Sequence, residues 1–226
     1  MGKLHDKSYP GESGEYLEAR DKLLEAEMEL RQKAEEVAEM RRGLPTGGAI
    51  DQDYEFEECG SGAKLKMSEL FADGKDSLII YSLMYGTDAE KACPACTSLL
   101  DSLNGISPHV TDQTNFAVVA KSPADKIQAW ADGRGWSNLR LLSSSENSFN
   151  EDYFAEDDEG NQWPCINVFT KSDGGVNHYW GAELFFAPGL DGMHPRHADP
   201  IWPLWNMFDL TPEGRPMEWF PKYSYE

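Results

Sequence analysis

The sequence contains no apolar run that approaches the roughly 20 residues needed to cross a bilayer. Residues 1–10 have no apolar core, so we expect no signal peptide. Basic residues are also scarce, because 20 Lys and Arg stand against 40 Asp and Glu, which gives a net charge of −20 at pH 7. This charge disfavours nucleic acids and anionic membranes as partners. Together these features predict a cytoplasmic protein.

Cysteine is rare, yet two of the four cysteines stand close together, in Cys93-Pro94-Ala95-Cys96. In the reducing cytoplasm, a close pair is more typical of catalysis, redox sensing or metal binding than of a structural disulfide. The apolar content of 40% is enough for a sizeable core, and 226 residues fit one medium domain with extensions or two small ones.

Three regions are expected along the chain. Residues 1–12 are polar with Gly and Pro, and we expect them to be disordered. Residues 13–45 predict one long helix, rich in Glu, Ala, Leu, Lys and Arg, which ends at Gly43 and Pro45. At about 40 Å, this helix either lies across the following domain or pairs with a second copy in a homodimer. Residues 46–226 form the third region.

The third region predicts an α/β fold, a mixed sheet flanked by helices, because expected strands alternate with expected helices. The nearly continuous apolar run Leu78–Tyr85 is typical of a central buried strand. Trp202, Trp205 and Phe208 in the C-terminal extension are expected to cover a core face. Further strands are expected at Tyr54–Glu58, Lys64–Met67, Phe116–Ala120, Leu139–Leu142, Ile166–Thr170 and Val176–Trp180, and helices at Thr97–Leu103 and Ser122–Trp130.

Cys93 and Cys96 stand where the buried strand leads into a helix. A helix N-terminus favours negative charge, which lowers the pKa of the first cysteine and increases its reactive thiolate form. The second cysteine lies one turn further on and can close a disulfide with the first. We therefore expect Cys93 to attack and Cys96 to resolve, with zinc binding and an inert pair as alternatives.

Side chains near the motif have two interpretations each. Lys91 either supports the thiolate or is an ordinary surface lysine, and Glu90 would raise the thiol pKa. Cys165 is either a buried core residue or a third thiol near the pair. Cys59 is expected to be a loop thiol without a role.

The histidines give a weaker signal. His194 and His197 have a spacing that suits a metal, but Pro195 and the lack of a ligand cluster favour hydrogen-bonded loop roles. His178 is expected to be a plain strand histidine, although it could reach the dithiol. We expect neither a bound metal nor a cofactor.

Several segments besides the Cys-Pro-x-Cys motif form a recognisable set: Arg41–Pro45, Tyr54–Glu57, Met84–Gly86, Ser122–Ile127, Gly135–Trp136, Ser148–Tyr153 and Asp209–Arg215. With these segments, the chain from about Tyr16 to Arg215 resembles a thioredoxin-like bacterial family of unknown function, whose members are predicted dithiol–disulfide oxidoreductases. The resemblance implies a thioredoxin-type sheet with a peroxiredoxin-like N-terminal hairpin.

In thioredoxin-like folds, a cis-proline faces the Cys-x-x-Cys motif beside a groove for an extended peptide. Pro164 follows Trp163 directly before an expected strand, so we expect a cis Pro164, with Pro94, Trp163 and Cys165 in the substrate groove. An ordinary trans proline at a strand start is the alternative. Thioredoxins carry a buried acid on an earlier strand, but the run Leu78–Tyr85 contains no carboxylate.

The sequence thus predicts exchange between the dithiol and a protein or small-molecule disulfide, with an unidentified reductant restoring the thiols. A peroxiredoxin-like peroxidase is one alternative, for which Arg134 and Arg140 are the nearest candidate helper arginines. A non-catalytic binding or assembly module is another, in which the long helix and the Trp-rich extension contact partners.

Overall fold

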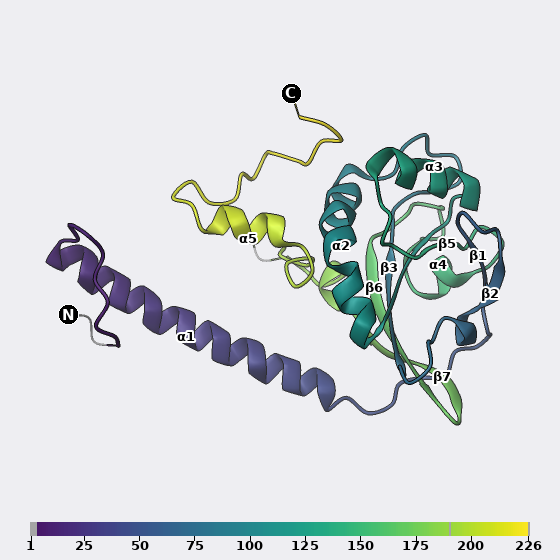
Figure 1. The fold of residues 1–226 in the computed structure, drawn as a ribbon, viewed down its shortest axis with the longest axis horizontal. Coiled ribbons are helices and arrows are strands. Elements are labelled where there is room, and N and C mark those ends of the chain that lie inside the picture. Colours follow the sequence, from purple (N-terminus) through teal and green to yellow (C-terminus); the bar gives the residue numbers. More distant parts are fainter. Residues whose placement is uncertain (1–3, 190, 226) are drawn as a thin grey trace. The chain divides into compact units, whose positions relative to one another are not determined.

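The computed structural model describes residues 4–189 and 191–225, which divide into two compact units, one up to residue 45 and one from residue 46 onward. The first unit is dominated by α1 (Gly14–Arg42), whose 29 residues confirm the long helix (Figure 1). The Ser13 hydroxyl caps it by accepting a hydrogen bond from the N–H of Tyr16 at 3.1 Å. Within the described ranges, no helix has both the length and the apolar composition that a membrane crossing requires.

The second unit is built on a seven-stranded mixed sheet with the strand order β2-β1-β5-β4-β3-β6-β7 (Figure 1). Here β3 (Ser77–Ser82) pairs in parallel with β4 (Asn115–Ala120) and antiparallel with β6 (Cys165–Ser172). A tight turn joins β6 to β7 (Gly175–Gly181). A β-α-β unit followed by such a hairpin is the thioredoxin-type arrangement, so the expected fold class is confirmed. The remaining strands are β1 (Glu55–Glu58) and β2 (Lys64–Lys66), which form the expected N-terminal hairpin, and β5 (Leu141–Ser143).

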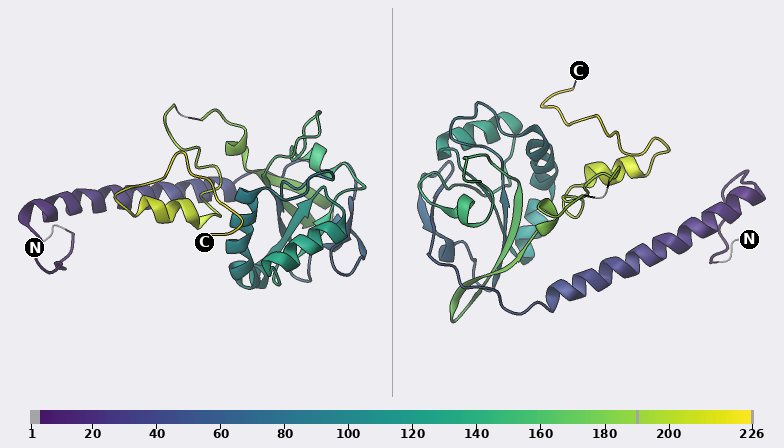
Figure 2. Two further views of the ribbon diagram at one scale, coloured as in Figure 1. Left: turned by 90° about the horizontal axis from the view of Figure 1, so that it is seen from above. Right: turned by 180° about the vertical axis from the view of Figure 1, so that it is seen from behind.

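Helices cover both faces of this sheet (Figure 2). Alternation along β3 sends Tyr81 into one core and Ile80 into the other. The core that contains Tyr81 also receives the apolar residues of α2, α3 and α5, whereas α4 packs in the other core. The bounds of the helices are Pro94–Gln113 for α2, Ala124–Arg134 for α3, Phe149–Asp152 for α4 and Pro203–Asp209 for α5, with short 3₁₀ turns at Met67–Glu69 and Glu183–Phe185.

The helix α2 extends far beyond the expected Thr97–Leu103, although it contains Pro108. A proline inside a helix lacks the N–H that would bond to the carbonyl four residues earlier, which here belongs to Asn104. The Asn104 carbonyl instead accepts a hydrogen bond from the side-chain amide of Asn138 at 3.1 Å. In return, the Asn104 side chain accepts one from the backbone N–H of Asn138 at 2.9 Å. This distant partner satisfies the freed carbonyl and allows the helix to continue.

A stability prediction follows from the core that α4 helps to form. Phe149 is fully buried there, and its ring meets those of Phe56 and Tyr54 edge-on, at centroid distances of 5.2 and 5.5 Å. We expect Phe149→Ala to lower the free energy of unfolding by about 3–5 kcal/mol, because the cavity cannot be refilled. The matched control is Phe154→Ala, at a side chain that is 68% exposed. Urea titrations should show a much smaller loss for the control, and equal losses would contradict this view of the core.

Candidate active site

The two thiols of the motif lie where β3 passes into α2. Cys93 directly precedes α2, and Cys96 lies in the first helical turn. The N–H of Cys93 donates to the carbonyl of Met84 at 2.9 Å, which fastens the start of the helix to the chain just after β3. Cys93 is half-buried, Cys96 is only 3% exposed, and both are free thiols. An incoming molecule therefore meets the sulfur of Cys93 first.

The two thiols differ strongly in acidity. The pKa of Cys93 is lowered from 9.0 to about 6, chiefly because the Cys96 thiol donates a hydrogen bond to the Cys93 thiolate. Burial opposes this shift, while the backbone N–H groups of Cys96 and Ala95 add to it. The same contact with Cys93, together with burial, raises the pKa of Cys96 well above its usual value. At pH 7, Cys93 is therefore mostly the nucleophilic thiolate, and Cys96 retains its proton.

Tyr81 is a functional candidate that the sequence analysis missed. It lies on β3, is 2% exposed, and lines the same cavity as Cys96, on whose pKa its hydroxyl acts. A hydrogen bond from this hydroxyl favours the Cys96 thiolate and so partly offsets the rise in the Cys96 pKa. Its position on the strand was the available signal, since alternation from Leu83 places Tyr81 on the α2 face of the sheet. A tyrosine hydroxyl thus lies beside the second thiol, on a strand that has no carboxylate.

Pro164 lies beside the dithiol, and it lines the same cavity as Cys93 and Cys96. The expectation of a cis peptide bond was wrong, however, because the bond between Trp163 and Pro164 is trans. The N–H of Trp163 donates to the carbonyl of Ala155 at 2.8 Å. Trans is the ordinary X-Pro isomer.

The other residues expected in the substrate groove lie at different places. Pro94 is half-buried at the first position of α2. Trp163 is 47% exposed and, together with Cys93, lines a separate groove outside the cavity. Cys165 is buried, donates its S–H to the carbonyl of Phe154 at 3.1 Å, and has a pKa raised to about 12 by burial. Cys93 is thus reached from two directions, through the cavity and through the groove.

Lys91 and Glu90 have contacts with two tyrosines. The Lys91 ammonium lies 5.5 Å from the ring centroid of Tyr223, and the carbonyl of Glu90 accepts a hydrogen bond from the Tyr85 hydroxyl at 3.5 Å. The pKa of Cys93 is shifted by the Cys96 thiol, by burial and by two backbone N–H groups, and neither Lys91 nor Glu90 is among these causes.

The histidines also have specific surroundings. His178 lies on the opposite face of the sheet, where its Nε2 is 2.9 Å from Oδ1 of Asn167 and its ring stacks on Tyr153. His194 and His197 both line the dithiol cavity, and burial is the main cause that lowers their pKa values. In residues 4–189 and 191–225, no group of three or more His, Cys, Asp or Glu is placed to hold a metal ion.

The remaining thiol and the two candidate arginines lie away from the motif. Cys59 has a pKa raised to about 12 by burial and by the nearby carboxylate of Glu57. Arg140 forms an ion pair with Glu58 at 3.0 Å, and Arg134 pairs with Asp101. Both guanidinium groups are thus engaged by carboxylates.

The cavity beside the thiols has a volume of about 390 Å³. Its lining includes Tyr81, the two thiols and Pro164. Aromatic residues of the C-terminal extension also line it, among them Trp202, Trp205, Trp219 and Phe220. Trp202 and Trp205 are each 5% exposed and join the core, as expected. Their position beside the dithiol was missed, since nothing in the local sequence indicates which core face they cover.

A family model described as "Bacterial protein of unknown function (DUF899)" matches residues 7–225. The chain belongs to this family. No curated protein matches it. One solved structure that resembles it is a PrxQ mutant from Xylella fastidiosa, with 11% identity and a TM-score of 0.47, over 61% of this chain and 84% of that one. Another is the peroxidoxin BcpB from Mycobacterium tuberculosis, with 14% identity and a TM-score of 0.47, over 70% of this chain and 94% of that one. A third is an exposed lipoprotein thioredoxin from Streptococcus pneumoniae, with 17% identity and a TM-score of 0.42, over 66% of this chain and 96% of that one.

The acidity of Cys93 leads to a direct prediction. Because its pKa in the folded protein is about 6, the rate of alkylation should rise with pH through that value and fall away below it. Cys96→Ala removes the strongest donor and should move this midpoint upward by about one to two pH units. Cys96→Ser, which keeps a hydroxyl donor, should move it less. Iodoacetamide labelling followed by peptide mass spectrometry measures the midpoint at Cys93, and a wild-type midpoint near 9 would contradict the geometry.

A further prediction concerns the Tyr81 hydroxyl. Tyr81→Phe keeps the ring and removes only the hydroxyl that lies beside Cys96. We expect closure of the Cys93–Cys96 disulfide to slow by about tenfold, because the Cys96 thiolate loses a hydrogen bond. The pH profile of Cys93 alkylation should stay in place, which separates this effect from general disruption. Rapid-quench mass spectrometry follows the closure, and an unchanged rate would remove Tyr81 from the mechanism.

Proposed function

We propose that this protein exchanges its dithiol with a disulfide substrate. The Cys93 thiolate attacks one sulfur of the substrate, the substrate S–S bond breaks, and the first substrate thiolate leaves. A mixed disulfide then joins Cys93 to the second half of the substrate. Cys96 loses its proton and attacks the sulfur of Cys93, which forms the Cys93–Cys96 disulfide and releases the second substrate thiolate.

Two electrons thus pass from the protein to the substrate, and an external thiol or dithiol must return them. The observation that carries the proposal is the asymmetry of the pair. One sulfur is half-buried with a pKa of about 6, and the other is buried, protonated and hydrogen-bonded to the first. An attacking thiol needs to be accessible and ionised, whereas a resolving thiol needs to stay protonated until the mixed disulfide has formed.

Tyr81 and Pro164 have supporting roles in this proposal. The Tyr81 hydroxyl stabilises negative charge on Cys96 as that thiol ionises, the step in which a buried sulfur is most costly to charge. Pro164 borders the sulfurs without an N–H of its own and so shapes the cavity without competing for the thiolate.

A thiol peroxidase is the second candidate, and the acidic Cys93 favours it equally. In that reaction, the Cys93 thiolate would attack one oxygen of a hydroperoxide, which breaks the O–O bond, forms a sulfenic acid and releases the other oxygen as an alcohol or water. The Cys96 thiol would then condense with the sulfenic acid to form the disulfide and release water. Against this candidate, the two arginines that could assist a leaving oxygen, Arg134 and Arg140, pair with Asp101 and Glu58.

Trapping of the mixed disulfide tests the proposal. Cys96→Ser cannot resolve, so the reduced variant should retain half of hydroxyethyl disulfide on Cys93, whereas the wild type should form the Cys93–Cys96 disulfide and Cys93→Ser should form neither. Cys59→Ser, at a thiol away from the site, is the matched control and should behave like the wild type. Mass spectrometry of the intact protein distinguishes these products.

Two outcomes would count against exchange. If Cys96→Ser gains no adduct, Cys93 does not attack disulfides. If the wild type forms its disulfide far faster with cumene hydroperoxide than with any disulfide, the peroxidase takes precedence.

A further inference from the structure

The C-terminal extension makes the dithiol part of the lining of an apolar pocket. The cavity of about 390 Å³ lies at the small end of the range for ligand sites, roughly 300–1,000 Å³. The rings of Phe185, Trp202, Trp205, Trp219 and Phe220 line it together with the two cysteines. Any molecule inside is therefore in contact with aromatic faces and with the attacking sulfur together.

Apart from the Cys93 thiolate, the pocket wall carries no charged side chain, although 27% of the residues in this chain are charged. Among its described residues, none is Asp, Glu, Lys or Arg, and its two histidines have lowered pKa values and so remain neutral at pH 7. An anionic substrate would lose its hydration there, find no cationic partner and meet the Cys93 thiolate, and a cationic substrate would find that thiolate as its single counter-charge. Both situations are costly. The pocket thus selects against charged disulfides.

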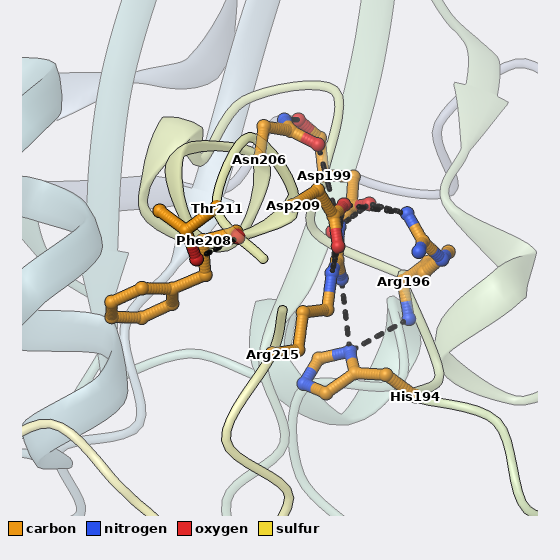
Figure 3. Close-up of polar contacts among 8 residues, drawn as sticks. All are labelled: His194, Arg196, Asp199, Asn206, Phe208, Asp209, Thr211 and Arg215. Carbon is orange, nitrogen blue, oxygen red and sulfur yellow. Dashed lines mark hydrogen bonds and ion pairs between the residues drawn. The ribbon is translucent and has the colours of Figure 1, made fainter. Parts of the chain in front are cut away.

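One buried guanidinium holds this wall together (Figure 3). Arg215, with a side chain only 4% exposed, donates to Asp199 at 2.6 Å and to Asp209 at 2.7 Å, and Arg196 adds a bond to Asp209 at 3.0 Å. These contacts hold the pKa of Asp209 near 2, so the network stays charged at neutral pH. The residues that line the pocket on either side of α5 are thereby fastened to each other.

Arg215 also sets the tautomer of His194, a histidine in the pocket wall. Its Nη1 lies 3.1 Å from Nδ1 of His194 (Figure 3). Arginine can only donate, so Nδ1 accepts and the proton of the neutral ring is on Nε2. The His194 ring lies 4.5 Å, between centroids, from that of Trp205. The wall therefore offers a neutral N–H donor among aromatic rings, which suits an uncharged heteroatom.

The end of the extension is fastened to the chain next to the motif. The Tyr223 hydroxyl donates to the carbonyl of Ala92, next to Cys93, at 2.7 Å. A polypeptide strand in the pocket would bury N–H and carbonyl groups against rings that cannot satisfy them. A protein disulfide would instead have to approach Cys93 through the outer groove that Trp163 lines.

We infer that this pocket binds a small, uncharged disulfide with aromatic or other apolar substituents, and that the C-terminal extension provides the specificity. The inference rests on the proposed exchange reaction and identifies its substrate class. The electron balance is unchanged: the dithiol loses two electrons, and the substrate leaves as two thiols.

Two chromogenic disulfides of similar size test the charge preference. Dipyridyl disulfide is uncharged at pH 7, and dithiobis(nitrobenzoate) is a dianion. Both rates are measured at high salt, which screens the net charge of the protein, and each is divided by the rate of the urea-unfolded protein with the same reagent. After this normalisation, we expect Cys93 to react at least tenfold faster with the uncharged reagent. Equal normalised rates, or faster reduction of insulin, would overturn the inference while leaving the exchange reaction intact.

Wall variants test the pocket itself. Phe220→Ala removes a ring that is 54% exposed, so the fold should tolerate it, and Trp205→Phe is a second, more conservative change. We expect Phe220→Ala to slow reaction with dipyridyl disulfide by about tenfold, since burial of one aromatic ring is lost. Met207→Ala is the matched control, because Met207 is on α5, is 61% exposed and does not line the pocket. If iodoacetamide labelling of Cys93 slows equally in Phe220→Ala, the effect is not one of binding.

A binding measurement without chemistry separates this inference from the proposed function. The double variant Cys93→Ser/Cys96→Ser cannot exchange, so dibenzyl sulfide, a thioether without an S–S bond, reports occupancy alone. We expect dibenzyl sulfide to quench the tryptophan fluorescence of this variant in a saturable way. When Phe220→Ala is added to the double variant, the affinity should fall about tenfold. Binding without any exchange in the wild type would reject the proposed function and keep the pocket. Exchange without binding would reject the pocket and keep the function.

Discussion

The sulfur of Cys93 accepts hydrogen bonds from the thiol of Cys96 and from the N–H groups of Ala95 and Cys96. These donors converge only because β3 delivers the motif to the first turn of α2, where the N–H of Cys93 is tied back to Met84. The sheet supplies the rest of the constraint, since β3 lies between β4 and β6 and its orientation is fixed on both sides. The orientation of β3 in turn places Tyr81 under Cys96. The acidity of one thiol and the burial of the other therefore follow from one strand-to-helix junction.

The C-terminal extension adds a second constraint, which acts on access rather than on reactivity. Without its rings, Cys93 and Cys96 would face water on the side that now forms a cavity of about 390 Å³. The aromatic segment has little regular structure apart from the seven residues of α5, and the Arg215 network takes the place of a longer helix in holding it. A charged cluster behind the wall thus supports an uncharged surface in front of it. This separation explains how an acidic chain can present an apolar pocket beside its most reactive group.

Much of this arrangement could be predicted from the sequence, and what was missed has a physical pattern. The central strand, the N-terminal hairpin and α1 carry local signals of apolar runs, alternation and capping residues, and the structure contains all three. The full length of α2 depends on Asn138, which lies 34 residues beyond Asn104. Tyr81 looks like an ordinary core residue until its neighbour is known, and the trans bond before Pro164 differs from the expected cis form. Arg215 and Asp199 are brought together by tertiary packing, which no periodicity encodes.

The reduction potential of the Cys93–Cys96 pair shows whether the two thiols form a redox couple. Protein equilibrated in graded glutathione buffers, alkylated and analysed by mass spectrometry gives the fraction of this disulfide at each potential. The account predicts a two-electron transition between roughly −300 and −120 mV, the range of dithiol oxidoreductases. It also predicts that the transition involves Cys93 and Cys96 and leaves Cys59 and Cys165 reduced. If no Cys93–Cys96 disulfide forms across the series, the pair is not a redox couple and the account is wrong.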